Sequence, residues 1–176
     1  MEAYAAGDAE SFQRLFRALA PSVHAFFLRS AARSAADDLV QTTFLKLHAA
    51  RRSWRRGERL RPWLFTIAAR VRVDWLRRQG RQDSELDEEA EADPDPREDP
   101  AAETLARERA DRVKRALDAL PEPQRVVVHL HRFEELGFAE IGRILGITEG
   151  AAKLRAFRGY GRLRTLLADL VAEEPK

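Results

Sequence analysis

The segment 60–81, LRPWLFTIAARVRVDWLRRQGR, constrains the fold of this chain most, because it is both amphipathic and strongly basic. Apolar residues recur along it at helical spacing, which predicts a helix that packs along one side. They are Leu64, Ala68, Val71 and Trp75. The segment also holds six arginines against one acid, Asp74. Because unpaired charge is costly to bury, another face of this helix must meet water or an anionic partner.

At about 100° per residue, a second face of the helix collects an indole and several guanidinium groups. These side chains are Trp63, Arg70, Arg77 and Arg81. Arginine neutralises phosphates and an aromatic ring stacks on an unpaired base, so this face suits a single-stranded nucleic acid. A solvated basic face without a ligand is the alternative. The preceding charged loop contains Trp54, which suits either base stacking or covering the edge of a core.

Charge is distributed unevenly, although the whole chain of 176 residues carries a net charge of only +2. Residues 51–82 hold eleven arginines against two acids, a local charge of +9, whereas residues 83–103 hold eleven acids against one arginine, a local charge of −10. This asymmetry predicts a polyanion-binding surface beside an acidic tether. The tether includes three prolines and few apolar residues, so we expect residues 82–103 to be a disordered linker. It divides the chain into two small all-α domains, residues 1–81 and residues 104–176.

In the first domain, apolar spacing predicts a helix over residues 8–29, with a break or a new first turn near Pro21. Ser34 then begins another helix, with Asp37 three residues on in the manner of a capping box. The apolar side of that helix comprises Leu39, Val40, Thr43 and Leu47.

The second domain is predicted to end in a helix-turn-helix. It begins with an amphipathic helix that carries Leu105, Val113, Leu117 and Leu120. Further on, two short helices are joined through Gly146, with Thr148 as the N-cap of the second. The packing side of that second helix comprises Ala152, Ala156, Gly159 and Leu163. Another side suits the major groove and comprises Arg155, Arg158 and Arg162. A short helical pair with a solvated basic face is the alternative.

No enzymatic chemistry is predicted. The chain has no cysteine, so it has no disulfide framework, zinc–thiolate site or thiol nucleophile. His129 and His131 are two residues apart and point in different directions on a helix, so they do not share a metal ion easily. We expect no catalytic residue, no metal site and no cofactor. Without a membrane-length apolar run or a signal pattern, we expect a soluble cytoplasmic protein that does not insert into membranes.

Two stretches, in the same order, resemble a known family. DDLVQTTFLKLHAA followed by RPWLFTIAARVRVDWLRR resembles the core-binding and promoter-melting domain of bacterial sigma factors. ALDALPEPQRVVVHLHRFEELGFAEIGRILGITEGAAKLRAFRGYGRLR resembles their helix-turn-helix domain. With only a short linker between, the chain resembles the extracytoplasmic-function group. The resemblance implies an alternative sigma factor that binds core RNA polymerase, directs it to specific promoters and initiates transcription.

The resemblance also implies three binding surfaces and a partner. The surface for the clamp helices of the polymerase's largest subunit would comprise Asp38, Leu39, Gln41, Thr42 and Leu45. The surface that melts and captures the minus-ten strand would comprise Trp54, Arg61, Trp63, Arg70, Arg77 and Arg78. The reader of the minus-thirty-five element in promoter DNA would comprise Lys153, Arg155, Arg158 and Arg162. The implied partner, besides polymerase and promoter, is an anti-sigma factor.

Several residues depart from the pattern of that family. Thr42 stands where the family usually has Glu, and Ala69-Arg70 stands where it has Arg-Asn. On the recognition helix, the usual valine, serine and larger aliphatic are replaced, which predicts shallower packing; the replacements are Ala152, Leu154 and Ala156. Two glycines add a helix penalty of about 1 kcal/mol each, and they are Gly159 and Gly161.

Two other functions also fit the residues. One is an ordinary transcription regulator, whose helix-turn-helix binds an operator and whose first domain senses or dimerises. The other is a protein-interaction module whose basic helix meets an acidic partner. A regulator should bind duplex operator alone and tightly, whereas a sigma factor should need core polymerase.

Overall fold

The structure is a computed structural model that describes residues 2–5, 8–30, 32–82 and 102–168. Every regular element in this part of the chain is helical, as predicted. The α-helices are α1 (Glu2–Ala5), α2 (Ala9–Leu28), α3 (Ala36–Ala50), α4 (Leu60–Gln82), α5 (Ala102–Asp118), α6 (Glu122–Arg132), α7 (Phe138–Leu145) and α8 (Glu149–Leu166). None of the described helices is long and apolar enough to cross a bilayer.

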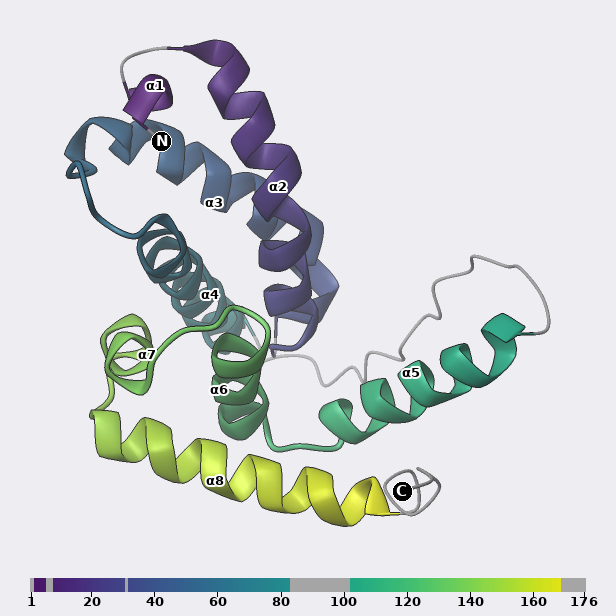
Figure 1. The fold of residues 1–176 in the computed structure, drawn as a ribbon. Coiled ribbons are helices and arrows are strands. Elements are labelled where there is room, and N and C mark those ends of the chain that lie inside the picture. Colours follow the sequence, from purple (N-terminus) through teal and green to yellow (C-terminus); the bar gives the residue numbers. More distant parts are fainter. Residues whose placement is uncertain (1, 6–7, 31, 83–101, 169–176) are drawn as a thin grey trace.

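Helices α1–α4 form one domain and α5–α8 a second, which confirms the two helical domains (Figure 1). Gln82 ends α4, and Ala102 and Glu103 begin α5, so both ends of the expected linker are helical. The rest of that linker, residues 83–101, lies outside the described part of the chain, as do the side chains of Arg81 and Leu105.

The core of the first domain is built from aromatic and aliphatic side chains of α2, α3 and α4. Fully buried members are Phe26, Phe27, Leu47, Leu64 and Phe65. The apolar stripe predicted along α4 faces this core, since Ala68 and Val71 are also buried and Trp75 packs against the cluster. Burial of these large side chains is the main force that fixes α4 against α2 and α3.

Two local expectations for the first domain are wrong. Pro21 lies inside an uninterrupted α2, on its exposed side, where the carbonyl that loses its hydrogen-bond donor can bond to water. Ser34 lies in a 3-10 turn, Arg33–Ala35, and α3 begins after it with no side-chain cap. The first turn of α3 carries acidic side chains instead, which favour a helix N-terminus through their charge.

The helix-turn-helix of the second domain forms as predicted. Gly146 adopts φ of +67°, a left-handed conformation that glycine tolerates without a steric penalty. Thr148 caps α8, because its Oγ1 accepts a hydrogen bond of 3.1 Å from the Ala151 N–H. The predicted packing side is buried at Ala152, Ala156 and Gly159. At Gly159 the helices approach so closely that a Cβ would lie 2.8 Å from Val128 Cγ2 of α6.

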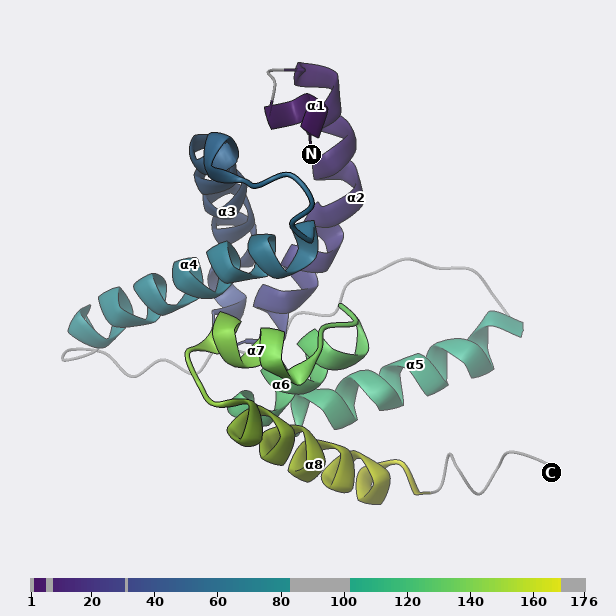
Figure 2. The ribbon, with the colours of Figure 1, turned by 60° about the vertical axis from the view of Figure 1, so that its left-hand side comes forward.

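The second domain packs directly on the first. Helices α6 and α7 lie between α4 and α8, and they contact α2 and α4 (Figures 1 and 2). One apolar cluster crosses the junction, with Phe26 and Phe65 from the first domain and Leu130 and Ile141 from the second. The junction is therefore a shared core rather than a loose contact.

Two ionisable side chains are buried at this junction. His129 of α6 is 1% exposed, and its ring lies 6.0 Å from Phe26 and 6.5 Å from Phe65 between centroids. Burial, followed by the charge of Arg29, lowers the pKa of His129 to about 3. Glu134 is 2% exposed, and burial raises its pKa. Its Oε1 lies 3.5 Å from Nε2 of His129. With a pKa of about 3, the His129 imidazole is neutral in the folded protein at physiological pH.

Gly142 and Gly161 offer a matched test of packing in the helix-turn-helix. A Cβ on Gly142 of α7 would lie 2.8 Å from the Ile147 carbonyl oxygen, whereas one on Gly161 of α8 would meet no atom within 4 Å. We expect Gly142→Ala to lower the free energy of unfolding by about 1–3 kcal/mol, because the backbone must shift. Gly161→Ala should raise it by about 0.5–1 kcal/mol through helix propensity. Urea unfolding followed by circular dichroism measures both, and shifts of the same sign would contradict this packing.

The buried His129 predicts a pH dependence of stability. The unfolded chain binds a proton at a histidine pKa of about 6.5, while the folded imidazole does so only near pH 3, so stability falls as pH drops between these values. Between pH 6.5 and pH 5 the loss should reach about 1.6 kcal/mol. His129→Phe keeps a ring among aromatic neighbours and should flatten this part of the urea-unfolding profile. A His129→Phe profile that keeps the native slope would contradict this assignment.

Candidate nucleic-acid interface

Helix α8 presents a basic outer face. Arg158 and Arg162 are exposed, whereas Arg155 is half-buried and lies at the edge of the face rather than at its centre. Lys153 is exposed and pairs with Glu149 one turn earlier, with 2.7 Å between Nζ and Oε1. An exposed pair of this kind is weak, so it would yield readily to a phosphate.

Sequence reasoning missed two apolar residues on the same face. Leu154 is 49% exposed and Phe157 is 77% exposed. The signal was present in the spacing: at about 100° per residue, both side chains turn away from buried Ala152 and Ala156. The outer face of α8 is therefore apolar at its centre and cationic at its edges.

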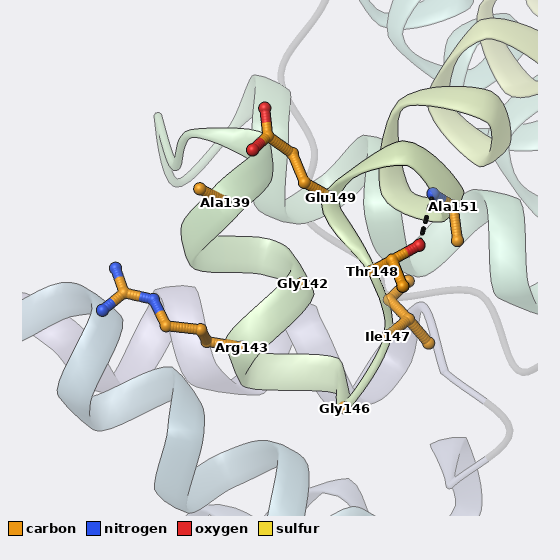
Figure 3. A pocket seen from close by; sticks show the side chains of 8 residues that line it. All are labelled: Ala139, Gly142, Arg143, Gly146, Ile147, Thr148, Glu149 and Ala151. Atoms are coloured by element: carbon orange, nitrogen blue, oxygen red, sulfur yellow. Dashed lines mark hydrogen bonds between the residues drawn. The ribbon is translucent and has the colours of Figure 1, made fainter.

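An open hollow runs over the turn between α7 and α8 (Figure 3). Small residues shape it, among them Ala139, Gly142 and Ala151. Arg143 of α7 is exposed at its side. The hollow is largely apolar and includes the acid Glu149. These residues do not form a separate binding site for an anion.

Exposed arginines line the side of α4 that faces away from both cores. Arg70, Arg77 and Arg78 are exposed, and none of them pairs with an acid among the residues that the structure describes. Trp63 is half-buried against the core, so only part of its ring is accessible. A strip of free guanidinium groups can neutralise the phosphates of a strand that runs along the helix.

Other arginines of the first domain are neutralised by acids of the second. Three of these pairs lie on α4 or just before it: Arg59 with Glu140 at 2.8 Å, Arg61 with Glu134, and Arg72 with Glu122. The sequence predicts that Arg61 meets the melted strand, whereas here a carboxylate occupies its guanidinium. The partners lie 50 to 81 residues apart along the chain, which is why no local pattern pointed to them.

Trp54 lies in the loop between α3 and α4 and is half-buried. Its indole N–H is shielded from solvent and has no acceptor among the described residues. Exposed arginines surround it in sequence, and one of them, Arg56, pairs with Glu2 of α1 at 3.0 Å. Partial exposure fits both predicted roles, base stacking and covering a core edge.

Helix α3 turns a mixed polar and apolar face to solvent. Asp38 and Gln41 are exposed, Leu45 is 64% exposed and Thr42 is half-buried. Leu39 requires a correction: it is only 6% exposed, because it lies about 100° around the helix from Asp38 and points into the core. Leu39 packs beneath this face and holds it in position, but it cannot contact a partner there.

Comparison with known proteins identifies the family of this chain. Residues 15–82 match Sigma-70 region 2, and residues 110–163 match Sigma-70, region 4. The chain is 39% identical to the RNA polymerase sigma factor CarQ of Myxococcus xanthus over 175 residues, which is 98% of each protein. It is 32% identical to the ECF RNA polymerase sigma factor SigF of Caulobacter vibrioides over 160 residues, 89% of this chain and 86% of that protein.

A solved structure shows the same architecture. The sigma factor RpoE from Bartonella quintana, in complex with the anti-sigma factor NepR, superposes with a TM-score of 0.71 at 27% identity. The match covers 91% of this chain and 98% of that one. Two sigma regions in the family order, and relatives matched over nearly their whole length, lead to one conclusion. The chain belongs to the sigma-70 family, in its ECF group, and is a promoter-specificity factor of RNA polymerase.

Proposed function

We propose that three separate faces of the chain divide the work of promoter-specific initiation. The outer face of α3 docks on the clamp helices of the largest polymerase subunit. The arginine strip of α4, with the loop around Trp54, captures the melted minus-ten strand. The outer face of α8 reads the minus-thirty-five element as duplex. The observation that carries this proposal is that each face is exposed, lies on a different element and has the chemistry of its ligand.

The chemistry of the α3 face suits a protein. Leu45 is 64% exposed, and polar Asp38 and Gln41 lie on the same side of the helix. An exposed aliphatic anchor with a polar rim is the usual anatomy of a protein–protein contact. The faces of α4 and α8 are instead cationic, which suits nucleic acid.

The test of the proposed function is run-off transcription from fragmented genomic DNA with purified core enzyme. We expect defined transcripts only when this chain is added, because the chain supplies promoter choice and the core supplies catalysis. This assay also separates the proposal from an ordinary regulator, which would bind duplex operator tightly without core enzyme. Because RNA polymerase acts in the cytoplasm of bacteria, this function also places the chain in the cytoplasm.

We further propose that an anti-sigma partner acts on the chain by holding the two domains together. The similarity to an inhibited sigma factor supports this, since RpoE from Bartonella quintana was solved in complex with NepR and matches over both domains. Such a partner would cover the outer face of α3, the basic helices, or both. Amide-protection mapping of the inhibited complex would show which of these surfaces is covered.

Docking through α3 predicts a loss of polymerase binding in a surface double variant. Asp38→Ala with Gln41→Ala removes polar contacts from an exposed face, so the fold should be kept while the affinity for core polymerase falls about tenfold. The control is Gln13→Ala with Glu108→Ala, the same two types of change at exposed positions of α2 and α5. Fluorescence anisotropy with core enzyme measures both. Equal affinity of the two double variants would rule out this docking face.

Capture of the melted strand predicts that the two domains must part. Glu134 neutralises the Arg61 guanidinium, so we expect the junction to open before this guanidinium binds a DNA phosphate. The chain has no cysteine, so Ala18→Cys on α2 and Thr165→Cys on α8 place two unique spin labels at exposed sites. We expect one inter-label distance, the closed distance, in the free protein and a longer one in the promoter complex.

A charge swap provides the control for opening. Arg72 is largely buried and pairs with Glu122, so Glu122→Arg leaves two like charges facing each other and should lengthen the inter-label distance without DNA. Arg72→Glu combined with Glu122→Arg restores an opposite pair and should restore the closed distance. A single variant that stays as compact as the native chain would show that these pairs do not hold the junction.

A further inference from the structure

The centre of the outer face of α8 is formed by Leu154 and Phe157, here called the apolar pair. They are 49% and 77% exposed and lie about 60° apart around the helix. An isolated exposed leucine is ordinary, but this pair occupies the part of a recognition helix that enters a major groove. Truncating either side chain removes no core contact, so the pair can be tested without loss of the fold.

The side chains around the apolar pair favour nucleic acid as its ligand. Exposed cations flank it on both sides of the helix, with Lys153 on one side and Arg158 and Arg162 on the other. Gly150 and Gly161 lie on the same face, and a Cβ at either position would meet nothing within 4 Å, so these two positions leave space beside the pair. A cationic rim complements the two phosphate backbones that border a groove.

The apolar pair is also accessible in the arrangement seen here. Helices α6 and α7 separate α8 from the first domain, so the outer face of α8 points away from the junction (Figure 2). A duplex can therefore approach Leu154 and Phe157 whether or not the domains are in contact.

The edge of a base pair that an aliphatic or aromatic side chain can recognise in the major groove is the C5-methyl group of thymine. Arginine reads guanine through hydrogen bonds, which leucine and phenylalanine cannot make. We propose that Leu154 and Phe157 determine specificity by contacting the methyl group of thymine in the upstream duplex element, beside the arginines. This inference rests on the proposed role of α8 as the minus-thirty-five reader.

The test uses holoenzyme assembled from the full chain and core polymerase. Duplexes selected from a randomised promoter library give the preferred upstream element, and each thymine in it is then replaced by uracil, which lacks only the methyl group. We expect at least one position where this replacement weakens binding about fourfold, the effect of burying one methyl-sized group. Leu154→Ala or Phe157→Ala should reduce that thymine-to-uracil ratio to about one.

Arg158→Ala is the matched control on the same face. It should weaken binding to thymine and uracil duplexes alike and keep the ratio between them. A selected element without thymine, or equal binding of thymine and uracil duplexes by the native chain, would overturn the inference and leave the apolar pair to a protein partner. Selection that enriches no upstream element at all would overturn the proposed role of α8 as well.

Discussion

A helix rich in arginine can be covered by another domain only where carboxylates meet its guanidinium groups, and the junction along α4 obeys this constraint. Arg72 is largely buried and forms an ion pair with Glu122. Arg61 forms an ion pair with Glu134, which is itself buried. The arginines without such partners, Arg70 among them, stay on the solvent side of the helix. Charge pairing therefore decides which part of α4 is covered and which part remains free for a strand.

For the proposed function, the consequence is that the junction engages Arg61 of the proposed strand-capture surface and leaves the exposed arginines of α4 and the outer faces of α3 and α8 free. Acids of the second domain pair with Arg61 and Arg72 of α4. The outer faces of α3 and α8 point away from the junction and stay exposed. In the proposed function, docking through α3 and duplex recognition through α8 are thus compatible with contact between the domains, whereas strand capture at Arg61 competes with Glu134. If a DNA phosphate replaces Glu134 beside Arg61, the guanidinium keeps an anionic partner. The electrostatic energy lost with one partner is then largely regained with the other.

The sequence predicts local structure well because local structure depends on neighbours in the chain. The apolar stripe of α4, the left-handed Gly146 and the Thr148 cap all follow from spacing and residue type, and the structure confirms them. The uninterrupted helix at Pro21 was missed, because water can satisfy a carbonyl on an exposed side. The ion pairs between the domains have no local signature. Their partners lie 50 or more residues apart, and only packing brings them together.

The balance between apolar and ionic contacts at the junction explains how it can be both specific and reversible. Buried ion pairs contribute little net stability, because desolvation offsets most of their attraction, but they disfavour any other register of the two domains. Stability comes instead from side chains such as Phe26, Phe65 and Ile141, each worth about 1.5–3 kcal/mol when fully buried. Opening the junction exposes part of that apolar surface and hydrates His129. The free chain therefore stays closed, and in the proposed function the binding of polymerase and promoter supplies the free energy that separates the domains.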